Sequence, residues 1–108
     1  MRRLDHVGVA VRDLEAASRF YGEVLGLPEA GAETVEEHKV RLRFFAAGAV
    51  RLELLAPAAA DSPLAKHLEA HGPGLHHICL EVEDLDAELA RLRRAGVACP
   101  ASGPRPGS

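Results

Sequence analysis

Two histidines and one glutamate stand out in this 108-residue sequence because their types and surroundings suggest one shared site. His6 and His77 each lie in a run of alternating apolar residues, and Glu53 lies in the mostly apolar run 50–55. An ionised carboxylate in such a run is costly unless a cation or a metal meets it. Neutral imidazoles and a carboxylate are suitable ligands for a divalent transition metal, and two histidines with one carboxylate is also the pattern of non-haem iron enzymes. One metal ion would satisfy all three side chains.

An internal repeat supports this site against a simpler interpretation, in which both histidines are hydrogen-bonded core residues and Glu53 pairs with Arg51 or Arg43. The segment 4–16 recurs 71 positions later as segment 75–87, with matching Leu, His, Val, Asp, Leu and Ala. Such a repeat indicates a supersecondary unit used twice. Two copies related by a pseudo-twofold axis could aim both imidazoles into one cavity, so the repeat favours the metal site.

The strands that carry the histidines are predicted to have two different faces, since side chains alternate along a strand. In the first copy, the face that should pack on a helix comprises Val7, Val9 and Val11. The open face comprises His6, Gly8 and Ala10. In the second copy, the corresponding faces comprise Ile78, Leu80, Val82 and His77, Cys79, Glu81. The open face has small residues beside the histidine, which leaves room for a ligand.

Capping signals predict two matching helices. Asp13 and Asp84 are expected to be their N-caps, and Gly26 and Gly96 are placed to end them. Three strands should follow the first helix. Two of them are predicted at 35–45 and 49–55, joined by a turn at 46–48. The prolines and glycines of the tail 100–108 predict that it has no regular secondary structure.

These elements predict one domain over residues 1–108. It divides into module one (1–57), a connecting helix (61–72) capped by Asp61-Ser62-Pro63, and a partial module two (74–108). His67 and His71 lie four apart on the connecting helix; they could bind metal, but we expect them on its solvated face.

Composition narrows the class of protein. The sequence is 47% hydrophobic and 27% charged, with a net charge of −3, which is typical of one globular domain and gives no reason to expect nucleic acid. The charged N-terminus lacks the apolar region of a signal peptide, and no apolar run reaches bilayer length, so we expect a cytoplasmic protein with no membrane partner. Cys79 and Cys99 are expected to be reduced thiols, with Cys79 in the wall of the site.

A family resemblance is carried by several short motifs. The opening LDHVGVAV (4–11), followed by DL, FY and VLGL (24–27), resembles the vicinal oxygen chelate superfamily, which includes glyoxalases, extradiol dioxygenases and antibiotic-resistance proteins. Within it, RLELLAP (51–57), DSPLAK (61–66) and GLHHI (74–78) are similar to methylmalonyl-CoA epimerases. The match runs from Leu4 to about Arg105, nearly the whole chain.

The resemblance implies an α+β fold in which paired βαβββ modules form a U-shaped mixed sheet around one divalent metal. Carried over by position, the metal ligands are His6, Glu53 and His77, with His76 a neighbour and not a ligand. Cobalt is the expected ion, with manganese, nickel or zinc as alternatives. The family interconverts (R)- and (S)-methylmalonyl-CoA, a step of propionate metabolism, by removing the α-proton to give a metal-stabilised enolate. The implied partners are a small acyl-CoA substrate and a second copy in a homodimer.

The chain departs from the family pattern in its second module. That module has its first strand and helix, but the counterpart of Glu53 would fall beyond Ser108. The family has there a glutamate that is both a metal ligand and the catalytic base, and the second carboxylate of some relatives aligns near Leu42 here. The catalytic residues are therefore unassigned. We expect these residues to be a fragment or an incomplete chain that exposes an apolar face and does not catalyse alone.

Two alternatives of other classes stay open. Another enzyme of the superfamily, a glyoxalase I-like lyase or an Fe(II) extradiol dioxygenase, would use the same ligands; the dioxygenase would consume oxygen with a catechol. A non-catalytic binding protein of the antibiotic-resistance type would keep the modules and lose the metal, and retention of His6, Glu53 and His77 argues against it.

Overall fold

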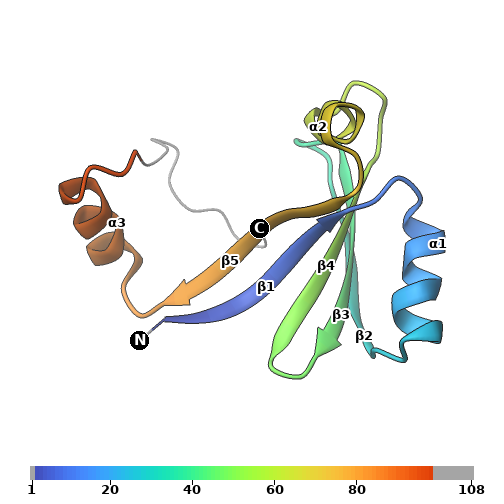
Figure 1. The fold of residues 1–108 in the computed structure, drawn as a ribbon, viewed down its shortest axis with the longest axis horizontal. Helices are drawn as coiled ribbons and strands as arrows, with labels where there is room; N and C mark the ends of the chain where they lie inside the picture. The colour runs from blue at the N-terminus through green and yellow to red at the C-terminus, as the bar shows by residue number, and fades with distance from the viewer. Residues whose placement is uncertain (1, 99–108) are drawn as a thin grey trace.

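The structure is a computed structural model that describes residues 2–98 (Figure 1). The predictions for Cys99 and for the tail 100–108 lie outside the described residues. In chain order the elements are β1 (Arg2–Ala10), α1 (Leu14–Arg19), the π-helical turn η1 (Phe20–Val24), β2 (Glu29–Val35), β3 (Val40–Ala47), β4 (Val50–Pro57), α2 (Pro63–His71), β5 (Gly74–Val82) and α3 (Leu85–Arg94). Among these residues, no helix has the length and apolar composition needed to cross a bilayer.

All five described strands form one mixed sheet in the order β2-β3-β4-β1-β5. Strand β1 runs parallel to β4 and antiparallel to β5, and the remaining neighbours are antiparallel. The α+β prediction is therefore confirmed. Because β1 lies between β4 and β5, the strand that opens the second copy of the repeat pairs directly with the strand that opens the first.

The helix boundaries follow from local chemistry. The side chains of Asp13 and Asp84 accept hydrogen bonds from the backbone N–H groups of Ala16 and Ala87, each at 3.0 Å, which confirms both predicted N-caps. The first helix turns π-helical at residues 20–24, and the chain then leaves it at Gly26, where φ is +74°. The connecting helix begins after Ser62, whose hydroxyl accepts from the Ala65 N–H.

One strand prediction is wrong. Residues 35–45 do not form a single strand, because 36–39 make a turn between β2 and β3. Lys39 ends that turn with φ of +55°, a left-handed conformation that an extended strand does not allow. Four consecutive polar residues, 36–39, form this reversal, and the alternation of apolar and polar residues begins only after it.

The sheet is packed on both faces around β3 and β4, whereas β2 is mostly exposed. On one face, Val9 and Val11 pack with Leu14 of α1, as predicted for the valine face. On the other face, Ala10 packs in the cluster that contains Leu64 and Leu68 of α2. Helix α2 thus covers one end of the face expected to be open, and only the part around His6 and Gly8 is left for a site.

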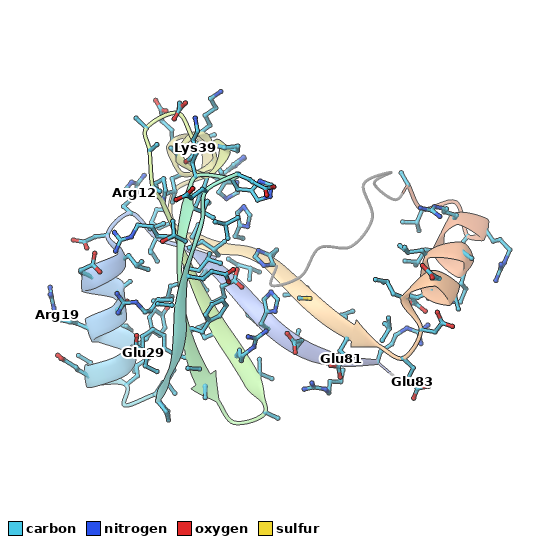
Figure 2. The ribbon with its side chains drawn as sticks, turned by 180° about the vertical axis from the view of Figure 1, so that it is seen from behind. Arg12, Arg19, Glu29, Lys39, Glu81 and Glu83 are labelled. Atoms are coloured by element: carbon cyan, nitrogen blue, oxygen red, sulfur yellow. The ribbon has the colours of Figure 1, made fainter. Side chains whose placement is uncertain are left out.

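The far half of the β1–β5 pair is uncovered. Ile78 and Leu80, which the sequence placed on a helix-packing face, are 57% and 52% exposed. Helix α3 lies apart from the other helices (Figure 1), and the Arg2 guanidinium joins it to β1 by donating to the Glu88 carboxylate at 2.6 Å. Figure 2 shows Glu81 and Glu83 at this α3 end, away from Lys39 at the α2 end. The sheet thus exposes apolar side chains at this end.

Candidate metal centre

Three neighbouring strands bring the predicted site residues together. His6 lies on β1, Glu53 on β4 and His77 on β5. Gly8 of β1 is the backbone partner of both Glu53 and His77, so these two side chains flank it on the same face. A Cβ on Gly8 would overlap the ring of His77, so the room that glycine was expected to leave for a ligand is taken by this imidazole.

The ligand atoms converge closely. The Nε2 atoms of His6 and His77 are 3.3 Å apart, and they lie 3.6 Å and 3.7 Å from the two carboxylate oxygens of Glu53. The two rings meet edge to face, with centroids 5.4 Å apart. His6 and Glu53 are 2% and 1% exposed, whereas His77 is partly exposed and forms the accessible side of the cluster. We call these three residues the His–Glu–His cluster.

Glu53 shows why this cluster suits a cation. Burial raises the pKa of its carboxyl group above the ordinary value, and the charges of His6 and Arg51 only partly oppose that effect. Its Oε2 atom is inaccessible to solvent and has no hydrogen-bond partner among the described residues. A buried carboxylate oxygen without a partner is destabilising, and a bound cation would supply the missing partner.

The simpler pairing of Glu53 with an arginine is not observed. Arg51 instead donates to Asp5 at 3.0 Å. Arg43 lies on the other face of the sheet, where its guanidinium reaches Glu15 at 3.3 Å. The side chain of Glu53 is thus left to the two histidines.

Asp5 is a site residue that sequence reasoning missed. Its Oδ2 atom lies 2.9 Å from Nδ1 of His6, and hydrogen bonds from His6 and Arg51 lower the pKa of its carboxyl group. Because an ionised carboxylate only accepts, Nδ1 of His6 carries the hydrogen and Nε2 keeps its lone pair for the cluster. Strict alternation would place residue 5 on the opposite face from residue 6. A bulge in the β1–β5 pairing at this point removes that restriction.

His77 has a comparable neighbour. Its Nδ1 atom lies 2.9 Å from Nδ1 of His76. Burial is the main cause that lowers the pKa of His77, with smaller effects from His76 and His6, and so favours the neutral imidazole that a metal requires.

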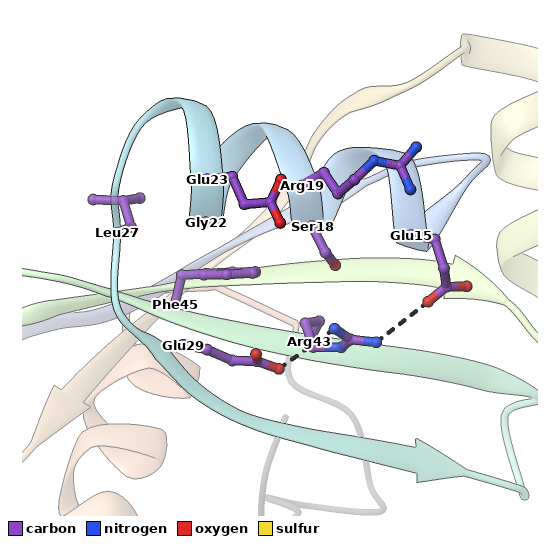
Figure 3. A pocket seen from close by; sticks show the side chains of 9 residues that line it. All are labelled: Glu15, Ser18, Arg19, Gly22, Glu23, Leu27, Glu29, Arg43 and Phe45. Carbon is purple, nitrogen blue, oxygen red and sulfur yellow. Dashed lines mark hydrogen bonds and ion pairs between the residues drawn. The ribbon is translucent and has the colours of Figure 1, made fainter.

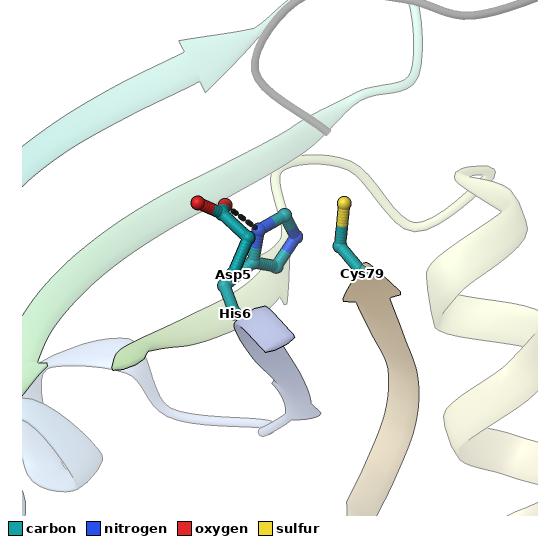
Figure 4. A group of neighbouring side chains, drawn as sticks. All are labelled: Asp5, His6 and Cys79. Carbon is teal, nitrogen blue, oxygen red and sulfur yellow. Dashed lines mark hydrogen bonds and ion pairs between the residues drawn. The ribbon is translucent and has the colours of Figure 1, made fainter. Parts of the chain in front are cut away.

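Cys79 lies beside His6, in the wall where the sequence placed it (Figure 4). Its sulfur, a nitrogen of His6 and a carboxylate oxygen of Asp5 all lie within 4.8 Å of one another. Burial, followed by the nearby charges of Asp5 and Glu53, raises the pKa of this free thiol, so it stays protonated near neutral pH.

The other residues weighed from the sequence lie outside the cluster. His67 is half-buried and His71 is exposed, and the ring centroid of His67 lies 4.9 Å from that of His71 and 4.7 Å from that of His76. Leu42, at the position where some relatives have a carboxylate, is buried in the core beneath α2. Glu81 accepts from Arg3 at 2.8 Å.

A separate hollow of about 430 Å³ lies between α1 and the sheet (Figure 3). Phe45 forms part of its floor, and Arg43 extends into it between Glu15 and Glu29. Since Phe45 belongs to the core on the α1 side of the sheet, this hollow is on the opposite face from the His–Glu–His cluster.

Comparisons with known proteins agree on one family. A family profile described as "Glyoxalase/Bleomycin resistance protein/Dioxygenase superfamily" matches residues 5–108. The uncharacterized protein YqjC of Bacillus subtilis is 50% identical over 92 residues, covering 85% of this chain and 66% of YqjC. Human mitochondrial methylmalonyl-CoA epimerase is 41% identical, covering 85% and 53%. The ethylmalonyl-CoA/methylmalonyl-CoA epimerase of Cereibacter sphaeroides is 41% identical, covering 94% and 76%.

Solved structures give the same result. The structure of a methylmalonyl-CoA epimerase in complex with methylmalonyl-CoA and NH4+ superposes with a TM-score of 0.89 at 37% identity, covering 100% of this chain and 79% of that one. The chain thus spans between about half and four fifths of the length of these proteins.

Proposed function

The chain belongs to the glyoxalase/bleomycin resistance protein/dioxygenase superfamily, and we propose that the protein is a metal-dependent methylmalonyl-CoA epimerase. The reaction interconverts (R)- and (S)-methylmalonyl-CoA by removal and return of the α-proton. The observation that carries the proposal is the convergence of His6, Glu53 and His77 on one point, in a chain whose relatives include epimerases of this substrate.

The donor set fits a divalent transition metal. Two neutral imidazoles and one carboxylate are ligands for such an ion, and the unpartnered Oε2 atom of Glu53 lies 3.6 Å from Nε2 of His6. Cobalt is the proposed ion, with manganese, nickel or zinc as alternatives. When bound, such an ion supplies positive charge that stabilises negative charge developing on the oxygens of an acyl-CoA thioester.

The chain's own residues prepare the site for that ion. Asp5 holds the hydrogen of His6 on Nδ1, so that Nε2 presents its lone pair to the cluster. Partial exposure of His77 leaves one side of the cluster open for an acyl-CoA substrate to approach. The residues that exchange the α-proton are not assigned within 2–98, where Glu36 and Glu37 lie exposed in the turn between β2 and β3.

Solvent isotope exchange tests the proposal. The full-length protein, loaded with cobalt, should exchange the α-hydrogen of methylmalonyl-CoA with solvent deuterium, and the His77→Ala variant should not. If protein with bound metal does not exchange the α-hydrogen, the assignment is refuted. Oxygen consumption with a catechol would instead identify a dioxygenase of the same superfamily. The proposed homodimer and cytoplasmic location are checked by light scattering and by cell fractionation.

A further inference from the structure

The pairing of β1 with β5 is interrupted twice, at positions related by the internal repeat. On β1 the register passes from Leu4 to His6, so Asp5 is an extra residue. On β5 it passes from His77 to Leu75, so His76 is an extra residue. Asp5 precedes one predicted metal ligand and His76 precedes the other. A bulge releases a residue from strict alternation and lets its side chain turn toward its neighbour.

Each extra residue contacts the same atom of the histidine that follows it. Oδ2 of Asp5 lies 2.9 Å from Nδ1 of His6, and Nδ1 of His76 lies 2.9 Å from Nδ1 of His77. The Nε2 atoms of both following histidines face Glu53. For His77 to offer a lone pair there, its hydrogen must be on Nδ1, and Nδ1 of His76 must be the acceptor.

The ring of His77 is held from a second side as well. It lies directly over Gly8, at the position that a Cβ on this residue would occupy. The ring of His76 is itself packed edge to face against His67 of α2, with centroids 4.7 Å apart. A continuous set of contacts therefore runs from α2 through His76 to His77.

We infer that His76 is a positioning residue, which fixes the tautomer and ring orientation of His77 as Asp5 fixes those of His6. The inference rests on the metal site of the proposed function. The carboxylate of Asp5 in the first copy of the repeat and the imidazole of His76 in the second copy would then have the same function at equivalent positions. Partners of this kind raise metal affinity without touching the metal.

Two substitutions of His76 in the full-length protein test the inference. His76→Ala removes the acceptor, whereas His76→Asn keeps a side-chain oxygen near the place of Nδ1. In a cobalt titration, His76→Ala should weaken binding by about 10-fold to 100-fold, and His76→Asn should stay within about threefold of the parent. The matched control is His71→Ala, which removes an exposed imidazole that packs against His67 outside the His–Glu–His cluster and should leave the affinity unchanged.

A second readout reports on His77 directly. Nitrogen-15 NMR of the metal-free protein should find the hydrogen of His77 on Nδ1 in the parent and in His76→Asn, and a mixture of tautomers in His76→Ala. Unchanged cobalt affinity and tautomer in His76→Ala would overturn the inference. So would equal losses in His76→Asn and His76→Ala, since His76 would then act as a ligand itself. If the parent binds no cobalt, the proposed metal site fails, and the tautomer measurement still decides the role of His76.

Discussion

Replacing Gly8 by alanine should remove His77 from the metal site without changing the identity of any proposed ligand. The added Cβ would overlap ring atoms Cε1, Nδ1 and Nε2 of His77, and the ring would have to withdraw by about 1 Å to reach ordinary van der Waals separation. Metal–ligand distances tolerate only about 0.2 Å. The substitution should therefore cost one ligand, and cobalt affinity should fall by at least about 100-fold, more than the loss of an outer partner costs.

The fold should survive this change. His77 is partly exposed, so its ring can swing outward instead of straining the core. Overpacking costs about 1–3 kcal/mol in general, and the reduced freedom of the unfolded chain returns about 0.4–1 kcal/mol of this when glycine becomes alanine. We expect the free energy of unfolding of the metal-free protein to fall by about 1 kcal/mol or less.

A double-mutant cycle separates this explanation from a general disturbance. Gly8→Ala should weaken cobalt binding in the parent but add nothing in a His77→Ala background, because the two changes remove the same ligand. Cys79→Ala is the control, since Cys79 occupies the equivalent position of the repeat, beside His6. It should leave affinity within about threefold. Parent-like binding by Gly8→Ala, or additive losses in the cycle, would refute the reasoning.

Three further predictions concern the same protein. His6→Ala and His77→Ala should each abolish most metal binding with the far-ultraviolet circular dichroism retained; elemental analysis showing parent-like metal content would place the ligands elsewhere. Glu53→Gln keeps an oxygen ligand but removes the buried charge, so it should weaken metal binding less and raise the stability of the metal-free protein by about 1 kcal/mol, measured by urea unfolding; a destabilised metal-free variant would contradict this. The pKa of Glu88 is lowered from 4.5 to about 2, chiefly by hydrogen bonds from Arg91 and Arg2. Its contribution is present above pH 4.5 and is lost as the pH falls toward 2, so the protection of α3 amides relative to their intrinsic exchange rates should fall in that window, and Glu88→Gln should remove this loss of protection.

Much of the local structure was determined by the sequence, because the relevant forces act over a few residues. Asp13 and Asp84 cap helices because each places a carboxylate acceptor directly before an amphipathic segment. The repeat placed His6 and His77 at equivalent positions, and the apolar surroundings of Glu53 indicated a buried charge in need of a partner. These signals were enough to predict that the three side chains meet, which the structure shows.

The supporting residues were decided only by the tertiary structure. Asp5 and His76 reach the site because bulges break the alternation of β1 and β5. A bulge depends on how two strands pair, so it cannot be predicted from the sequence of either strand alone. Gly8 matters because the ring of His77 comes to lie over it from the neighbouring strand. The turn at 36–39 divides the strand predicted over 35–45, because the chain reverses there to pair β2 with β3. Contacts between segments distant in sequence set these features, and residue patterns report mainly on near neighbours.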